Sequence, residues 1–165
     1  MTAQNKTEKR RNEIVEAAAS HLVAHGFQHS GLRAIARSVG ISDRMIMYYF
    51  ETKEDLISAA LERIGESLAN GMDDAVPLSN MTAGQVLNAL SGALQAEEVR
   101  PIMQLWFEII GMAMRGEEPY RQTAAILLSR SEEQIRSKLR SDQKHRAREI
   151  LAALEGSVMI DILLD

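Results

Sequence analysis

Arginine, serine, tyrosine and lysine side chains lie close together in and just before residues 33–56, RAIARSVGISDRMIMYYFETKEDL. A guanidinium group can bind guanine through two hydrogen bonds, so Arg33 and Arg44 are candidates for reading base edges. Hydroxyl and ammonium groups more often hold phosphates. The candidates for that second role are Ser30, Ser42, Tyr48, Tyr49 and Lys53. These residue types and spacings favour recognition of duplex DNA.

A helix-turn-helix would place these side chains on the protein surface. Gly40 can adopt the positive φ that the tight turn requires, and Ser42 can cap the helix that follows. The residues that fit the packing are Ala36 at the helix crossing, Ile41 at the corner, and Ile46 and Phe50 on the buried face. The exposed face then carries Asp43, Arg44, Met45, Met47 and Tyr48. Because a bare helical hairpin has a similar pattern, the spacing alone does not establish DNA binding.

The remainder of the chain also has helical periodicity. Alanine and leucine recur throughout, and runs of β-branched residues are rare. Ser30, Thr52 and Thr82 each stand where a helix cap is expected. The predicted fold class is all-α. The expected helices cover residues 7–25, 31–39, 43–50, 53–72, 83–94, 101–115, 119–139 and 142–164.

Charge is distributed unevenly along the 165 residues, although the formal net charge is −4. The first 53 residues contain eight basic and five acidic side chains, a net charge of +3, whereas the rest contains 11 and 18, a net charge of −7. A basic segment joined to an acidic one suits a protein that docks one end on an anion, but ordinary charge scatter gives a similar pattern.

Composition argues against several other classes of protein. The chain has no cysteine, which fits a reducing cytoplasm, and no signal peptide or apolar run of about 20 residues that would span a membrane. The histidines, His21, His25, His29 and His145, lack the spacing of a metal site. We find no Ser-His-Asp set, phosphate-binding glycine loop or carboxylate cluster. Neither an enzyme nor a bound metal or cofactor is expected.

Residues 11–60 resemble the TetR family of bacterial transcriptional regulators. The matching motifs are Gly26-Phe27, Ile35-Ala36, Gly40-Ile41-Ser42, Tyr49-Phe50 and Lys53-Glu54-Asp55-Leu56. Three positions depart from the family pattern: Ser30 replaces a common Thr, Arg44 a frequent Gly, and Met47 a Tyr that usually contacts phosphate. Tyr48 can take the role of that Tyr. Arg44 places a long cation near the groove floor, so we expect a different operator from that of members with Gly.

The resemblance implies two domains: a helix-turn-helix DNA-binding domain over residues 1–54, and an effector-binding and dimerisation domain over residues 55–165. It further implies a cytoplasmic homodimer that binds a palindromic double-stranded operator, with half-sites about 34–36 Å apart. The expected function is that of a repressor released by a small apolar or aromatic effector. Two alternatives stay open. One is a DNA-binding regulator controlled by a protein partner, and the other is a helical interaction module without a DNA role.

The resemblance also assigns residues beyond position 60. The predicted effector pocket comprises Met103, Trp106, Phe107, Ile110, Met114 and Tyr120, although spacing alone favours a plain hydrophobic core. The last helix is apolar over much of its circumference, so we expect it to pack on a partner. The predicted interface residues are Leu151, Leu154, Val158 and Ile162, with Leu163 as a further candidate. The family usually has a further helix there, which is either missing after Asp165 or absent from this protein.

Overall fold

The computed structural model describes residues 3–27, 30–118 and 120–164. Within these ranges the fold is all-α, as predicted, and the sole β pairing is one isolated bridge between Met81 and Leu139. The predicted start of the seventh helix, Pro119, lies outside the described residues. The helices are α1 (Ala3–His25), α2 (Leu32–Val39), α3 (Asp43–Tyr49), α4 (Lys53–Ala75), α5 (Ala83–Leu94), α6 (Arg100–Met114), α7 (Tyr120–Lys138), the 3-10 helix η1 (Ser141–Arg146) and α8 (Ala147–Leu164).

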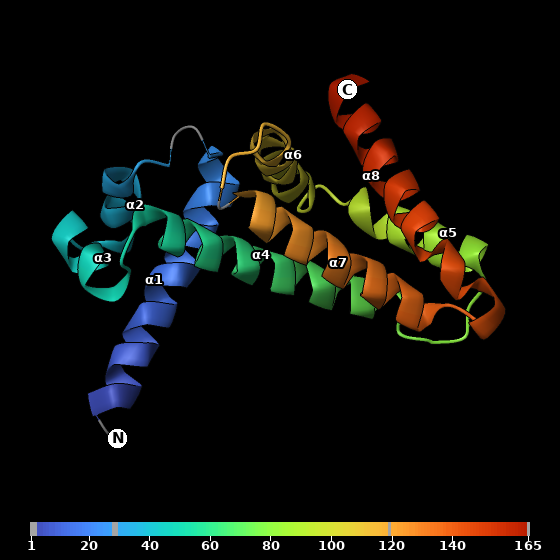
Figure 1. The fold of residues 1–165 in the computed structure, drawn as a ribbon, viewed down its shortest axis with the longest axis horizontal. Coiled ribbons are helices and arrows are strands. Elements are labelled where there is room, and N and C mark those ends of the chain that lie inside the picture. Colours follow the sequence, from blue (N-terminus) through green and yellow to red (C-terminus); the bar gives the residue numbers. More distant parts are fainter. Residues whose placement is uncertain (1–2, 28–29, 119, 165) are drawn as a thin grey trace.

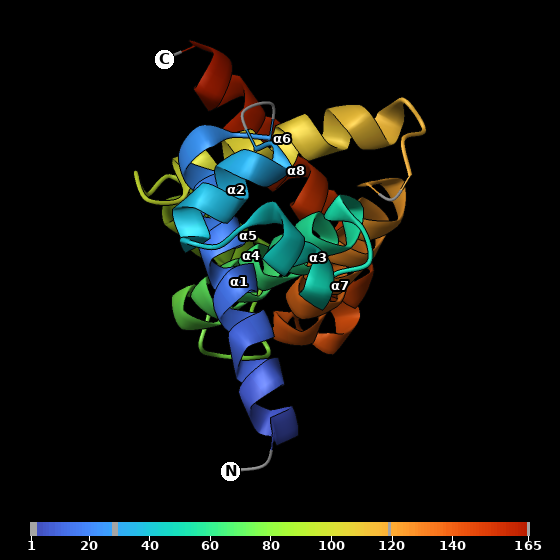
Figure 2. The same cartoon turned by 90° about the vertical axis from the view of Figure 1, so that its left-hand side faces the viewer.

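The helices form a small head of α1–α3 at one end of an elongated body of α4–α8 (Figure 1). In the body, α4 and α7 pack against each other along their length, and α5 packs against α8 at the end far from the head. Figure 2 views the molecule from the head, where α2 and α3 lie in front of the long α4. In both views the carboxyl end of α8 extends away from the other helices.

Three of the four predicted caps are confirmed. Thr52 and Thr82 each begin a helix with a complete capping box, closed by Asp55 and Gln85 respectively. The Ser42 hydroxyl accepts a hydrogen bond from the Met45 N–H at the start of α3. These contacts satisfy amide groups that the first helical turn leaves without partners. The boundaries of the third to fifth helices follow from them.

The last helix begins later than predicted. Residues 141–146 form the 3-10 helix η1, and α8 starts at Ala147. The tighter turn brings Gln143 to α5, where its Oε1 accepts a hydrogen bond of 2.6 Å from the Ala83 N–H. The Lys144 carbonyl accepts a hydrogen bond from Arg136 of α7. Segment 141–146 is therefore a corner that holds α5, α7 and α8 together.

The buried apolar residues form two cores. The first core joins α1, α2, α3 and the first half of α4 with Leu105, Ile109 and Met112 of α6. The second core joins α5, the end of α7 and α8 around Val86 and Ile150. The first core thus extends across the predicted domain boundary at residue 54, so the head is packed directly on the body.

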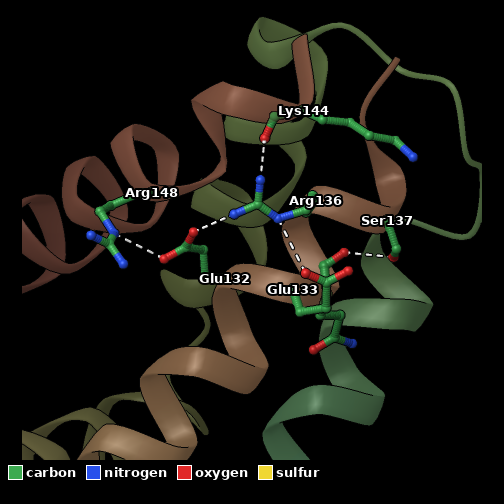
Figure 3. A network of polar contacts seen from close by, with 7 residues as sticks. Glu132, Glu133, Arg136, Ser137, Lys144 and Arg148 are labelled. Carbon is green, nitrogen blue, oxygen red and sulfur yellow. Dashed lines mark hydrogen bonds and ion pairs between the residues drawn. The ribbon is translucent and has the colours of Figure 1, made fainter. Parts of the chain in front are cut away.

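A polar network fixes α7 against α8 (Figure 3). The carboxylate of Glu132, which is 17% exposed, accepts hydrogen bonds from Arg136 of its own helix and from Arg148 of α8. Arg136 also pairs with Glu133 at 3.1 Å. A carboxylate with two cationic donors is well satisfied at low exposure. The network therefore sets the relative positions of two helices that wall the cavity described below.

Candidate nucleic-acid interface and effector cavity

The turn between α2 and α3 has the predicted geometry. Gly40 is in the left-handed region, with φ of 72°, and the N–H of Ile41 donates to the carbonyl of Ala36 at 3.0 Å. This pair of features closes α2 in a Schellman motif. Ile46 is fully buried and Phe50 is 3% exposed, as predicted. With that face buried in the first core, the opposite face of α3 is directed to solvent.

The exposed face of α3 carries a mixture of polar, aromatic and apolar side chains. Tyr48 is 74% exposed, and Arg44, Met45 and Met47 are also exposed. Arg33 of α2 reaches the start of α3, where its Nε lies 3.4 Å from Asp43 Oδ2. Since this ion pair lies at the surface, it is worth at most about 1 kcal/mol and leaves Arg33 available. The structure thus brings the two predicted base-reading arginines to the same end of α3.

Tyr49 and Lys53 are less exposed than Tyr48. Tyr49 is half-buried, and its ring packs edge-to-face on Tyr48 with centroids 5.1 Å apart. The ammonium group of Lys53 lies 5.5 Å from the ring centroid of Phe27, which is a cation–π contact. Both residues flank the exposed face of α3 in sequence and stay candidates for phosphate contacts.

Ser30 does not have either predicted role. Its side chain is fully buried, and its hydroxyl donates a hydrogen bond of 2.6 Å to the Gly26 carbonyl. Gly31, which makes no side-chain cap, precedes α2 instead. The prediction that Ser30 caps the second helix and touches phosphate is wrong, because the hydroxyl is used to close the turn after α1.

Phe27 links the head to three helices of the body. Its N–H donates to Glu108 Oε2 of α6 at 2.8 Å, and its ring packs edge-to-face on Tyr120 at the start of α7. The cation–π contact with Lys53 also joins Phe27 to the start of α4. Tyr120 is buried in the first core, and burial, with Glu54 and Glu117 nearby, raises the pKa of its hydroxyl. The prediction that Tyr120 lines an effector pocket is therefore wrong.

Replacement of Gly26 by alanine should destabilise the chain more than the same change at Gly40. Both glycines have positive φ, 71° and 72°, which costs an L-residue about 1–2 kcal/mol. A Cβ at Gly40 meets no atom within 4 Å, whereas at Gly26 it would lie 2.8 Å from Glu108 Oε1. Because that carboxylate must move and weaken its bond to Phe27, Gly26→Ala should cost about 1–2 kcal/mol more in urea unfolding. Equal costs would show that the Glu108 contact contributes nothing.

A cavity of about 150 Å³ lies inside the body, between α4, α6, α7 and α8. Most of its lining is apolar, and it is drawn from both cores, with Leu61 and Leu105 from the first and Leu154 from the second. Met103 and Trp106 line it, as predicted. Gly65 of α4 also lines it and allows close approach of α7, since a Cβ there would lie 2.5 Å from Leu127. This cavity is the candidate effector site.

The other predicted pocket residues of α6 are not in the cavity lining. Phe107 and Ile110 are half-buried elsewhere on the helix, and Met114 is 83% exposed. The cavity borders only the first part of α6, around residues 102–106, whereas Ile109 and Met112 further along belong to the first core. The assignment of Phe107, Ile110 and Met114 to the pocket is wrong. It assumed that one apolar stripe faces the cavity along the whole of α6, whereas only the first part of the helix does so.

Sequence reasoning missed the polar residues of the cavity. Glu155 of α8 lies in the lining, and its Oε1 accepts a hydrogen bond of 3.1 Å from Trp106 Nε1. Gln134 of α7 also lines it and donates to the Ala69 carbonyl of α4 at 2.7 Å. Glu155 had a signal in the sequence, because it is one of two acidic residues in the apolar stretch ILAALEGSVMIDILL.

Comparison with known proteins identifies the family. Residues 14–60 match the family described as bacterial regulatory proteins, tetR family. The chain is 26% identical over 121 residues to the HTH-type transcriptional regulator PksA of Bacillus subtilis (strain 168). Residues 14–60 of this chain belong to the TetR family. The match to PksA covers 73% of this chain, and the chain spans about 59% of the length of PksA.

Solved structures share the fold of almost the whole chain. A transcriptional regulator from Rhodococcus sp. Rha1, RHA1_ro04179, superposes with a TM-score of 0.76 at 16% identity, over 93% of this chain and 84% of that one. The multidrug binding protein EbrR, complexed with proflavin, has a TM-score of 0.70 at 24% identity, over 94% and 89% of the two chains. The match therefore includes the body as well as the head.

The exposed apolar face of α8 differs from the predicted one. Leu154 and Val158 are buried within the chain, so their assignment to a partner interface is wrong. Leu151 is half-buried and lines the cavity, and its interface role stays a prediction. Ile162 is half-buried. Residues one or two positions away on the helix are the exposed ones, because the periodicity of a helix that is apolar over much of its circumference does not reveal which face the body covers. The exposed residues are Met159, Ile160, Leu163 and Leu164.

Among the described residues, no three His, Asp or Glu side chains lie close enough together to hold a metal ion. His29 lies outside those residues. No helix in the part of the chain that the structure describes is both long and apolar enough to cross a membrane.

Proposed function

We propose that the chain is a cytoplasmic transcriptional regulator that binds an operator through α3 and is released by a small molecule in the body cavity. The observation that carries the DNA role is the arrangement of α3: Ile46 is fully buried, while Arg44 and Tyr48 are exposed beside Arg33. A helix anchored in this way can enter a major groove about 12 Å wide. Family membership supports the same role.

Electrophoretic mobility shift at two salt concentrations tests the DNA role. The wild-type chain should bind selected duplexes, with affinity that falls steeply between about 50 and 200 mM salt as phosphate counterions are released. Addition of an effector should release the duplex. Salt-independent binding, or none, would favour a helical interaction module. DNA binding that resists every small molecule in a panel of apolar compounds would favour control by a protein partner.

We further propose that the regulator is a homodimer formed through α8. Exposure of Ile160 to 51% and Leu163 to 74% on a projecting helix supports this, since clustered apolar side chains are costly in water. A dimer interface on this face of α8 would bury apolar side chains that are exposed to solvent in the single chain. A two-fold dimer would then present two copies of α3 to successive major grooves, about 34–36 Å apart.

Substitution of the α8 face should produce a monomer. Ile160→Lys combined with Leu163→Lys places two charges in the proposed interface, and we expect sedimentation velocity to give half the mass of the wild-type species. Met114→Lys is the matched control, because Met114 is 83% exposed on α6 and lies outside this face. If the double variant keeps the mass of the wild-type dimer, the α8 face is not the interface.

The route from cavity to head runs through α6 in this proposal. Trp106 and Leu105 line the cavity, and Glu108, less than one turn further on, holds the N–H of Phe27. A ligand that shifts α6 would therefore move the turn that joins α1 to α2, and with it Lys53 on the Phe27 ring. Binding would favour a conformer in which the two copies of α3 no longer match the operator.

A further inference from the structure

Glu155 is a carboxylate without a cationic partner in the wall of an apolar cavity. Its one hydrogen bond within the described chain comes from Trp106 Nε1, and it forms no ion pair there with Lys, Arg or His. Burial raises the pKa of Glu155, and the bond from Trp106 partly opposes that rise. A desolvated carboxylate is costly unless a cation or several donors satisfy it.

The other charged residues of the cavity lining do not neutralise Glu155. Glu66 has the same sign and pairs with Arg63 at 3.7 Å. Arg130 is exposed to solvent, and within the described parts of the chain it forms no ion pair with Glu155. Apart from the neutral side chains of Ser131 and Gln134, the interior therefore offers one acid, one indole and a lining that consists mainly of leucine, isoleucine and methionine side chains. That combination attracts a ligand with an apolar body and a positive charge.

We propose that the effector of this cavity is a lipophilic cation, whose charge pairs with the Glu155 carboxylate and whose apolar body packs between α4, α6 and α8. The inference rests on the effector role proposed above and names the chemical class of the ligand. Trp106 would contribute to ligand binding in two ways. Its N–H donates a hydrogen bond to the Glu155 carboxylate, and its indole ring can form a cation–π contact with the ligand. A neutral or anionic ligand would leave the carboxylate unpaired in the cavity.

The size of the cavity limits the first probes. A volume of about 150 Å³ is similar to that of an engineered protein cavity that holds benzene. The cavity thus matches one aromatic ring, and a ring with a compact charged group is a suitable first probe that requires only small shifts of the lining side chains, whereas larger cations must push the helices apart. Benzyltrimethylammonium carries a permanent charge, and neopentylbenzene has the same shape without it. Phenylacetate supplies the opposite charge on a similar ring.

Thermal shift titration of the full chain with these three probes tests the inference. Wild-type protein should bind benzyltrimethylammonium at least tenfold more tightly than neopentylbenzene. Glu155→Gln keeps the size of the side chain and an acceptor for Trp106, but it should weaken binding of the cation at least tenfold and leave the neutral probe unchanged. Glu66→Gln is the control, since this second acid of the lining is exposed and already paired, and it should change neither affinity.

The outcomes separate this inference from the proposed function. If Glu155→Gln binds the cation as well as the wild type does, or if phenylacetate binds more tightly than the cation, the inference is overturned, and the effector role stands. If none of the three probes raises the melting temperature, the inference falls together with this cavity as an effector site. DNA binding by mobility shift is independent of both results. Glu155→Gln should melt no lower than the wild type, because it removes a half-buried charge that has no cationic partner among the described residues.

Discussion

Replacement of Ile109 by alanine should destabilise the entire chain by about 2–5 kcal/mol and lower its melting temperature by roughly 4–20 °C. Ile109 is fully buried in α6, yet its core also contains Ile46 of α3 and Leu56 of α4. The head therefore shares its core with the body. We expect one cooperative transition, with the loss of DNA binding on heating at the same midpoint as the loss of helix by circular dichroism.

A matched isoleucine tests whether burial is the cause. Ile126 of α7 is 37% exposed, so Ile126→Ala should cost well under half as much as Ile109→Ala. Two separate transitions in Ile109→Ala, with the head melting independently of α5 and α8, would contradict a shared core. That result would support folding of residues 1–54 as an autonomous unit, which stays a prediction.

Replacement of Arg44 by alanine should relax base preference, whereas replacement of Lys53 should weaken binding to all sequences alike. Arg44 is exposed near the start of α3, where a guanidinium can discriminate a guanine by about 1–3 kcal/mol, roughly 5- to 150-fold. Lys53 is at the first turn of α4 and fits a phosphate contact, so its loss should reduce the salt slope by about one. Both are measured on a duplex that the wild-type protein selects from a random pool, against a scrambled duplex.

The exposed Arg140 provides a control for charge alone. It follows the carboxyl end of α7, far from the head, and pairs with Asp142 at 3.5 Å, so Arg140→Ala should alter neither specific nor scrambled binding by more than about twofold. If Arg44→Ala and Lys53→Ala lower both affinities in the same ratio, Arg44 holds a phosphate and does not read a base.

Local rules of the sequence predicted the head accurately, because its signals are short and chemically specific. Gly40 was expected at the tight turn because it can adopt positive φ, and Thr52 was expected to cap the fourth helix. The spacing of Ile46 and Phe50 predicted the buried face of α3. The prediction for Ser30 was wrong because both Ser30 and Gly31 are plausible positions just before the second helix. Only the three-dimensional structure shows that the Ser30 hydroxyl donates to the Gly26 carbonyl and closes the turn there.

The body was predicted less well, because its helices are apolar on more than one side. For α8 the pattern could not show whether Val158 or Ile160 faces the interior, since both fit an apolar stripe. In α6 the stripe that contains Met103 was assigned to one pocket, but the helix changes neighbours along its length. Glu155 was missed because its role arises from a contact with Trp106, 49 residues away. Such contacts depend on how helices cross, which periodicity does not encode.

The position of the cavity at the junction of the two cores has a consequence for how such a regulator can diverge. Any occupant is held by side chains that also stabilise the head on one side and the α5–α8 pair on the other. If the cavity binds the effector as proposed, a conservative change deep in either core, such as valine for isoleucine, should shift the ligand concentration at which DNA is released, although it touches neither the ligand nor DNA. Sensitivity and ligand identity can thus evolve at separate sites.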